Sequence, residues 1–310
     1  MHASNINIIP SHKLDKLKWD DCIEKSLNGL IYATSVYLDH MADDWEVMIL
    51  NDHEFVMPLP CRKKFGIRYI YPPAFTQQLG IFSAKPVDAN VVDVFLKNIS
   101  SAFRYCELNL NYANPVRHYK DVRRKNYLLD LHSDYQSLQK NYSRSAKRNM
   151  AKAVEEITVT EDADADEIIH IHRNRFKDKI GANANDYERF SSLVHTLTKK
   201  DECITIAAKD KHNNTIAGSI YFRYKNRLTF ILNGNTTESL NVGATHLLKD
   251  FFIKKFAGSS YILDFEGSDF PNFATFYEQF GAKTIEYYSS LIINKLPPPL
   301  RWLKANPTSS

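Results

Sequence analysis

One stretch, residues 227–293, constrains the fold of this chain more than any other. Its hydrophobic spacing predicts a strand, a helix, a strand, a helix and a strand in turn, over residues 228–232, 243–257, 261–265, 272–280 and 283–293. Two strands joined by one crossover helix are expected to be parallel, with a right-handed connection. Parallel neighbours that separate near a glycine leave a cleft at their carboxyl ends, where ligands of open α/β sheets usually bind.

Four residues around this cleft are candidates for binding a negatively charged group. Asn233 and Gly234 interrupt the first strand, and Gly243 and Ala244 begin the helix that follows. Backbone N–H groups at a helix N-terminus are free to bind a phosphate or an oxyanion. We therefore expect a phosphate site near Gly243 and Ala244, and an oxyanion site near the break at Asn233 and Gly234.

The composition indicates two globular domains without a dominant charge. The 310 residues, 44% of them hydrophobic, suffice for two cores, and the 40 basic and 36 acidic residues nearly balance. The four cysteines have no ligand spacing, which favours free thiols in a cytoplasm over a structural zinc. His170 and His172 point in different directions on a helix, and we interpret them as surface or packing residues. Without a secretory leader or a run of about 18 apolar residues, the protein is expected to be soluble and cytoplasmic.

The first half of the chain carries a similar pattern. Residues 80–109 repeat the strand, helix and strand of residues 234–264 with almost no sequence identity. We interpret this as two domains, residues 1–125 and 126–296, with a tail over 297–310; two unrelated α/β segments are the alternative. In a repeat, Gln77 and Gln78, on a strand predicted over 77–82, face the cleft from the first half. Because a buried amide is costly unless it is hydrogen-bonded, we expect a ligand or a water beside them.

A helix predicted from Ser133 onward has one apolar and one basic side. The apolar side carries residues at four-residue spacing, namely Leu138, Tyr142, Ala146, Met150 and Val154. The other side, the basic stripe, carries Lys140, Arg144, Arg148 and Lys152. Solvated helix faces usually mix their charges, so the basic stripe indicates an anionic partner. The alternative is that acidic side chains from elsewhere in the fold neutralise it.

Three motifs resemble the GNAT acyltransferases and, among them, the Fem family. Tyr277 and Gly281 resemble the Tyr-x-x-x-Gly turn near the end of the GNAT fold, although Tyr277 could instead be a packing residue. Tyr127-Leu-Leu-Asp-Leu and Ser145-Ala-Lys-Arg-Asn-Met-Ala-Lys-Ala resemble the entrance to the second Fem domain. Fem proteins are tandem GNAT-fold transferases that move amino acids from aminoacyl-tRNA to a peptidoglycan precursor. The resemblance implies an α/β fold with mixed sheets, in which two GNAT-like domains, the first degenerate, stand in tandem.

The chain departs from the sequence patterns of transferases that use aminoacyl-tRNA and of those that use acyl-coenzyme A. It lacks the long helical insertion that some Fem members use for tRNA. The GNAT pyrophosphate loop is incomplete in residues 239–244, which keep Gly243 and Ala244 but not the leading Arg or Gln. Acyl-coenzyme A is the favoured donor because the Tyr-x-x-x-Gly turn is present, and aminoacyl-tRNA is the alternative.

The resemblance implies an N-acyltransferase with an amine acceptor, which would be anionic if it binds the basic stripe. Tyr277 would protonate the leaving group, and Asp264 or Glu266 would be the base, acting through a water. Asp264 could instead cap a neighbouring helix. Acyl-coenzyme A is expected as a co-substrate, with no tightly bound cofactor, no metal, no membrane span and no DNA. An inactive module that keeps the fold to bind an anion is a third interpretation.

Overall fold

The computed structural model describes residues 6–177, 181–267 and 271–298, which fall into two compact units. Unit 1 comprises Met1–Arg124 and Tyr287–Ser310, and unit 2 comprises Lys125–Glu286. The first division lies one residue from the start that the sequence predicts for the second domain. The last strand, which the sequence places in that domain, is grouped with unit 1 from Tyr287 onward. Residues 299–310 of the expected tail lie outside the described residues.

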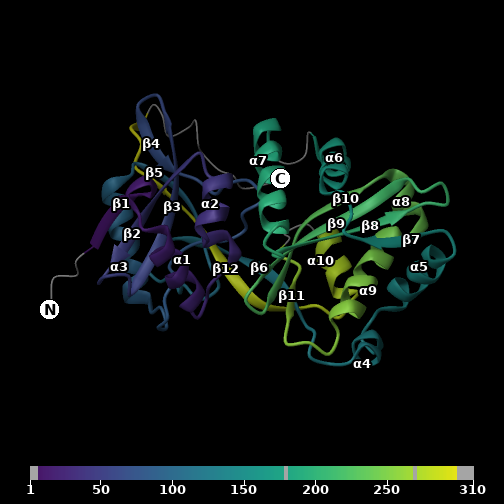
Figure 1. Ribbon diagram of the computed structural model, residues 1–310. Coiled ribbons are helices and arrows are strands. Elements are labelled where there is room, and N and C mark those ends of the chain that lie inside the picture. The colour runs from purple at the N-terminus through teal and green to yellow at the C-terminus, as the bar shows by residue number, and fades with distance from the viewer. Residues whose placement is uncertain (1–5, 178–180, 268–270, 299–310) are drawn as a thin grey trace. The chain divides into compact units, whose positions relative to one another are not determined.

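Unit 1 is a mixed sheet with helices on both faces (Figure 1). Its strand order is β1 (Ile6–Pro10), β2 (Asp44–Leu50), β3 (Phe55–Lys64), β4 (Ile67–Ile70), β5 (Tyr105–Leu110) and β12 (Lys283–Asn294). Neighbours are antiparallel except β4 and β5, which are parallel. Its helices are η1 (Ser11–Lys13), α1 (Lys16–Lys25), η2 (Ile31–Ala33), α2 (Ser35–Met41) and α3 (Ala89–Ala102). Alternation along β2 sends Met48 to the core under α3, whereas Trp45 meets Trp19 of α1.

Residues 77–82 do not form the strand that the sequence predicts. They contribute only isolated bridges, from Leu79 to Leu110 and from Phe82 to Val56. Side-chain amides add to the backbone hydrogen bonds of these bridges: Asn111 Nδ2 donates to the Leu79 carbonyl at 2.8 Å. The parallel partner of β5 is therefore β4, which lies earlier in the chain.

Unit 2 contains a second mixed run of strands, in the order β6 (Asp121–Asp130), β11 (Ile262–Asp264), β10 (Arg227–Asn235), β9 (Thr215–Tyr224), β8 (Cys203–Lys209) and β7 (Thr158–Glu161). Here β10 and β11 are the parallel pair. Helices α6 (Ala165–Phe176) and α7 (Ala184–Thr198) cover one face (Figure 1). The other face carries α4 (Tyr135–Lys140), α5 (Arg144–Val154), α9 (Ala244–Phe256) and α10 (Pro271–Glu278), while α8 (Thr237–Val242) precedes α9.

The two units repeat one strand pattern. Each has four antiparallel strands, then a strand parallel to the fourth, then an antiparallel sixth strand. The elements that correspond are β4, α3 and β5 in unit 1 and β10, α9 and β11 in unit 2. The sixth strands are exchanged: β6 follows β5 in the sequence but pairs with β11, and β12 follows α10 but pairs with β5.

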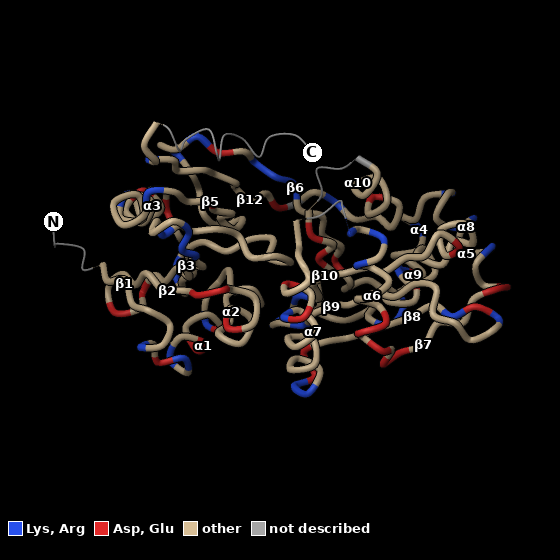
Figure 2. The backbone as a smooth tube through the Cα atoms, turned by 90° about the horizontal axis from the view of Figure 1, so that it is seen from above, with Lys and Arg blue, Asp and Glu red and all other residues tan. Residues whose placement is uncertain are grey.

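The predicted basic helix is two helices. Asp134, rather than Ser133, caps α4, and Ser143 caps α5 by accepting a hydrogen bond from the Ala146 N–H. Val154, at the end of α5, is 65% exposed rather than part of the apolar side. Lys, Arg, Asp and Glu are distributed along both units (Figure 2). No helix in the described ranges has the length and apolar character needed to cross a bilayer.

Candidate active site

A cavity of about 450 Å³ lies in unit 2 where the paired part of β10 and β11 ends. Most of its wall is apolar or aromatic, made by Phe176, Phe230, Ile231, Leu232, Leu240, Phe265, Phe273, Phe276 and Tyr277. The other lining residues are His172, Asn233, Asn235, Ser239, Gly243, Thr245, His246, Glu266, Gly267 and Asn272. Its volume and lining are those of a small-molecule site.

A β-bulge, and not a break at Asn233 and Gly234, accompanies the opening of the sheet. The parallel pairing of β10 with β11 ends at Thr229. The register of β10 against β9 then shifts between Phe230 and Leu232, which leaves one extra residue in β10. Asn233 and Gly234 remain paired within the strand. The cavity is thus at the carboxyl ends where the sequence predicts a cleft, but Gly234 does not interrupt the strand.

The glycines beside the cavity allow helices to pack closely. A Cβ on Gly234 would lie 2.6 Å from the backbone oxygen of Ile168 in α6, and one on Gly243 would lie 2.5 Å from that of Asn149 in α5. Gly243 also has a φ of +81°, which favours glycine. Asn233 and Gly243 line the cavity, whereas Gly234 and Ala244 do not.

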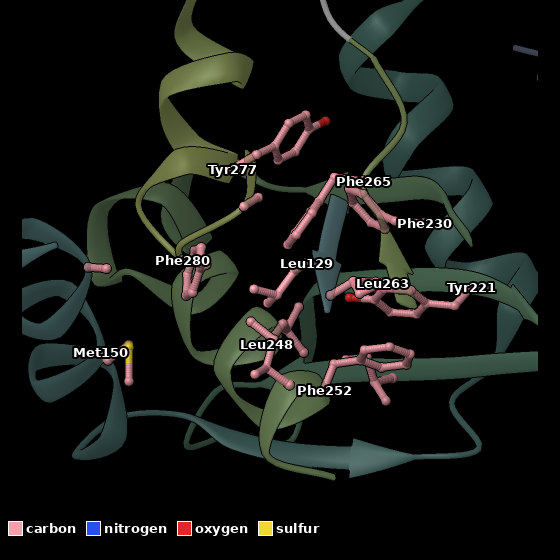
Figure 3. Close-up of a cluster of buried hydrophobic side chains, with 14 of the residues drawn as sticks. Leu129, Met150, Tyr221, Phe230, Leu248, Phe252, Leu263, Phe265, Tyr277 and Phe280 are labelled. Carbon is pink, nitrogen blue, oxygen red and sulfur yellow. The ribbon is translucent and has the colours of Figure 1, made fainter. Parts of the chain in front are cut away.

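Tyr277, on α10, has its ring in the core of unit 2. The ring stacks on Phe265 with centroids 5.0 Å apart and lies 5.9 Å from the ring of Tyr127. Its hydroxyl points away from the cluster (Figure 3), and no described residue forms a hydrogen bond with it. Burial raises the pKa of Tyr277, and the Glu266 and Asp264 carboxylates raise it further, so the phenol is protonated at neutral pH.

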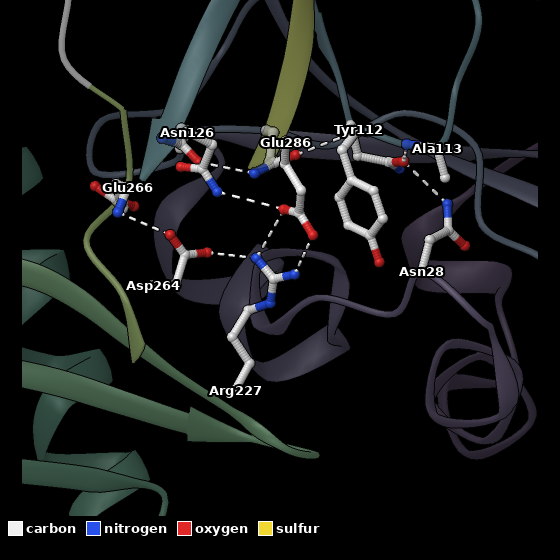
Figure 4. Close-up of polar contacts among 11 residues, drawn as sticks. Asn28, Tyr112, Ala113, Asn126, Arg227, Asp264, Glu266 and Glu286 are labelled. Carbon is white, nitrogen blue, oxygen red and sulfur yellow. Dashed lines mark hydrogen bonds and ion pairs between the residues drawn. The ribbon is translucent and has the colours of Figure 1, made fainter. Parts of the chain in front are cut away.

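Asp264 belongs to a buried ion-pair network and does not line the cavity (Figure 4). Its Oδ2 accepts a hydrogen bond from Arg227 Nη1 at 2.6 Å, and its Oδ1 accepts one from the Glu266 N–H at 2.8 Å. Arg227 Nη2 also donates to Glu286 Oε1 at 2.8 Å. Burial would lower the pKa of Arg227, but the two carboxylates outweigh it and raise the pKa. Since Asp264 is 1% exposed and both its oxygens are engaged, its geometry argues against a role as base.

Glu266 and His172 are the lining residues best suited to accept a proton. Glu266 follows β11 and has a φ of +61°. His172 Nδ1 lies 2.9 Å from the Asn233 carbonyl, so Nδ1 carries the hydrogen and Nε2 is the basic nitrogen. Burial lowers the pKa of His172, against the opposing effect of this backbone hydrogen bond, which favours a neutral imidazole.

His170 is exposed and the His172 ring packs against Phe176 and Tyr187, which agrees with the interpretation of the two histidines as surface or packing residues. That interpretation did not include the place of His172 in the cavity wall. His172 and Phe176 are four residues apart on α6 and both line the cavity. Their one-turn spacing was a signal for a shared helix face. The sequence alone did not indicate that this face meets the end of β10.

His246 joins two of the sequence motifs. Its Nε2 lies 3.0 Å from Gln279 Oε1, within the Tyr277–Gly281 turn, and 3.2 Å from Asn149 Nδ2, within the Fem-like segment. Burial lowers the pKa of His246. The two motifs thus meet at one wall of the cavity, which sequence analysis did not foresee.

The basic stripe does not line the cavity. Lys140, Arg144 and Arg148 are exposed, and none forms an ion pair with a described residue, so the alternative of neutralisation by acidic side chains is not observed there. Lys152 Nζ donates to the Asn241 carbonyl at 2.7 Å. The end of the stripe therefore lies beside the turn between α8 and α9, where Gly243 reaches the cavity.

Gln77 and Gln78 lie in unit 1 and are hydrogen-bonded there. Gln78 Nε2 donates to Gln77 Oε1 at 2.8 Å, and Gln78 Oε1 accepts from the Tyr112 N–H at 3.2 Å. The cavity that Gln78 lines has a volume of about 20 Å³, which is room for about one water. The cavity beside Gln78 is therefore far smaller than the cavity of unit 2.

Solved structures share this architecture over nearly the whole chain. FemX aligns with a TM-score of 0.63 at 10% identity, covering 96% of this chain and 99% of FemX. A tandem GNAT protein from the clavulanic acid biosynthesis pathway aligns with a TM-score of 0.54 at 9% identity, covering 94% and 99%. L-PGS from Bacillus licheniformis aligns with a TM-score of 0.52 at 10% identity, covering 86% and 90%. No protein-family model and no curated protein sequence matches the chain.

At such low identity, the similarity establishes the fold and not the activity. It agrees with the strand pattern that both units share and with the motifs in the sequence. The chain has the α/β fold of tandem GNAT proteins, as the sequence predicts.

Proposed function

We propose that the cavity of unit 2 transfers an acyl group from acyl-coenzyme A to an amine. The observation that carries the proposal is the position of Tyr277. Its hydroxyl is at a mainly apolar cavity, is protonated at neutral pH and has no hydrogen-bond partner among the described residues. A hydroxyl in this position is available to donate its proton to a leaving group.

The surroundings suit a coenzyme A thioester as co-substrate. No side chain of the described residues caps the first turn of α9. The Gly243 N–H donates to the Ser239 carbonyl and the His246 N–H to the Gly243 carbonyl, so the Ala244 and Thr245 N–H groups are the ones that would bind a phosphate. The basic stripe ends beside that turn, at Lys152. The acyl group would occupy the apolar part of the cavity. The incomplete GNAT loop is offset in this arrangement by cations from α5.

In the proposed reaction, the amine nitrogen attacks the thioester carbonyl carbon. A C–N bond forms and the C–S bond breaks. The proton from the amine passes to Glu266 or to His172 Nε2, directly or through water, and Tyr277 donates its proton to the leaving sulfur. The basic nitrogen of His172 adds a second candidate to the carboxylate that the sequence indicated.

Replacing Tyr277 by Phe tests the proposal. The ring and its packing remain, so stability should hold while turnover with acyl-coenzyme A falls about 10²-fold or more. Tyr127→Phe is the matched control, because Tyr127 packs against Tyr277 but does not line the cavity. A folded Tyr277→Phe protein at near-full rate would refute the thioester mechanism.

Aminoacyl-tRNA is the second candidate donor. It is favoured by Lys140, Arg144 and Arg148, which form no ion pair with a described residue, and by the structural likeness to FemX. Its leaving group is a ribose hydroxyl whose neighbouring hydroxyl can relay the proton, so Tyr277→Phe should matter much less. Charge reversal of Arg144 and Arg148 should then weaken tRNA binding in a salt-dependent way. Loss of transfer in the Tyr277→Phe protein would also argue against an inactive binding module.

A further inference from the structure

The described lining of the unit 2 cavity contains few charged side chains. Glu266 is the single carboxylate among the described lining residues, and none of those residues is Lys or Arg. Burial lowers the pKa values of His172 and His246, so neither supplies a positive charge at neutral pH. A ligand carboxylate would therefore enter a cavity whose described side chains offer it no cation and one repelling charge.

The wall, in contrast, suits an ammonium group on an apolar skeleton. Six aromatic rings line it, those of Phe176, Phe230, Phe265, Phe273, Phe276 and Tyr277. Aromatic faces attract cations, and an alkylamine is protonated at neutral pH until a base removes its proton. Glu266 and Tyr277 line the same cavity, and the Glu266 carboxylate contributes to the raised pKa of the Tyr277 hydroxyl.

We propose that the acceptor is a primary amine on an apolar, uncharged skeleton. Glu266 holds its ammonium group, and the lack of a cation among the described lining residues excludes amino acids and other anionic amines. The inference rests on the proposed function, because it names the acceptor for the same cavity. Among the described residues at the wall, the first turn of α9 supplies partial positive charge, and the donor phosphate occupies it in the proposed reaction.

A matched set of three small molecules tests the proposal by calorimetric titration of the full-length protein, with and without coenzyme A. 2-Phenylethylamine carries the ammonium, phenylalanine adds a carboxylate, and 2-phenylethanol lacks the charge. We expect 2-phenylethylamine to bind at least tenfold more tightly than either of the others. Equal or tighter binding of phenylalanine would overturn the proposal.

Two substitutions assign the selectivity to named residues. Glu266→Gln should weaken the binding of 2-phenylethylamine at least tenfold and leave the binding of 2-phenylethanol unchanged. Leu240 lines the cavity and is 46% exposed, so it is not part of the hydrophobic core. Leu240→Arg therefore adds a cation at the cavity and should raise the affinity for phenylalanine about tenfold. Val154→Arg is the control, because Val154 is 65% exposed in the same unit but does not line the cavity. No response of ammonium binding to Glu266→Gln would refute the role of that carboxylate.

Binding and transfer are measured separately, so the two proposals can fail separately. If 2-phenylethylamine binds selectively but is not acylated with any acyl-coenzyme A offered, the proposed function fails and the selectivity stands. If phenylalanine is acylated in preference to 2-phenylethylamine, the selectivity fails and the transferase function stands.

Discussion

At the scale of single residues, the core of unit 2 contains an amine that the proposed reaction does not use. Lys249 of α9 is 0% exposed. Its Nζ forms a 2.8 Å hydrogen bond with the Tyr221 hydroxyl and lies 2.9 Å from the ring centroid of Phe230. Burial holds its pKa well below the usual value, and no charged group of the described residues offsets this effect. Lys249 is therefore a site where folding opposes protonation.

Replacing Lys249 by Met should stabilise the protein, and more so as the pH falls. Between the lowered pKa of the native lysine and about 10.4, the unfolded chain binds a proton that the native state does not. The native protein should therefore lose about 1.4 kcal/mol per pH unit relative to the variant as the pH falls through this window. Denaturant unfolding at several pH values measures the difference. The exposed Lys254→Met is the control, and a pH-independent difference for Lys249→Met would contradict the prediction.

Asp264 and Glu266 are two residues apart but should respond differently to substitution. Asp264→Ala leaves the buried Arg227 with one of its two carboxylates, and breaking such a buried pair costs about 3–5 kcal/mol. Glu266→Gln keeps the size of the side chain and leaves Asp264 in place, so it should change acyl transfer far more than stability. Measuring thermal unfolding and turnover of both variants checks this. A stable Asp264→Ala protein without activity would indicate that Asp264 takes part in catalysis.

At the scale of elements, two glycines determine how α6 sits on the sheet. Gly218 and Gly234 face each other in β9 and β10, and a Cβ on either would meet Ile168 of α6 at 2.4 and 2.6 Å, respectively. Helix α6 also carries His172, whose Nδ1 is hydrogen-bonded to the carbonyl next to Gly234. The packing of α6 on the sheet and the position of the His172 imidazole are thus coupled.

Gly234→Ala should therefore destabilise unit 2 and disturb the cavity. The contact is with the backbone oxygen of Ile168, which cannot move without the helix, so a cost of about 1–3 kcal/mol is expected. Acyl transfer should fall as His172 moves. Gly181→Ala is the control, since its added Cβ would meet nothing within 4 Å. Unchanged unfolding of Gly234→Ala would show that α6 tolerates a methyl group there.

Local patterns in the sequence predicted most of these elements. The strand, helix and strand of β10, α9 and β11 lie within three residues of their expected bounds, because apolar spacing determines them. Residues 77–82 were assigned wrongly because isolated bridges and side-chain amides, and not a strand ladder, hold them. The role of Asp264 could not be seen because its partner, Arg227, is 37 residues away. Asn233 and Glu266 were found because they directly follow predicted strands.

At the scale of the whole molecule, the exchange of sixth strands was beyond the sequence pattern, since β6 and β12 could each have paired within its own half. It leads to a prediction for a chain that stops after Glu286. Unit 2 would retain all its residues, but unit 1 would lose the strand in which Leu291 and Ile293 are buried. Hydrogen exchange should then show protection retained at β8, β9 and β10 of unit 2 and lost at β5. A chain that stops after Pro298 is the control, and full protection of β5 in the shorter chain would contradict the prediction.

The exchange of the sixth strands also determines the order in which the two units finish folding during synthesis. When β5 leaves the ribosome, the strand that will cover its edge is roughly 170 residues from being made, which at 5–20 residues per second is about 10–35 s. During that time the edge is a template for wrong pairing, and β6, which emerges next, is the nearest wrong partner. Unit 2 is continuous in the sequence and is complete once Glu286 has emerged. The unit whose sequence comes first is therefore the one that finishes folding last.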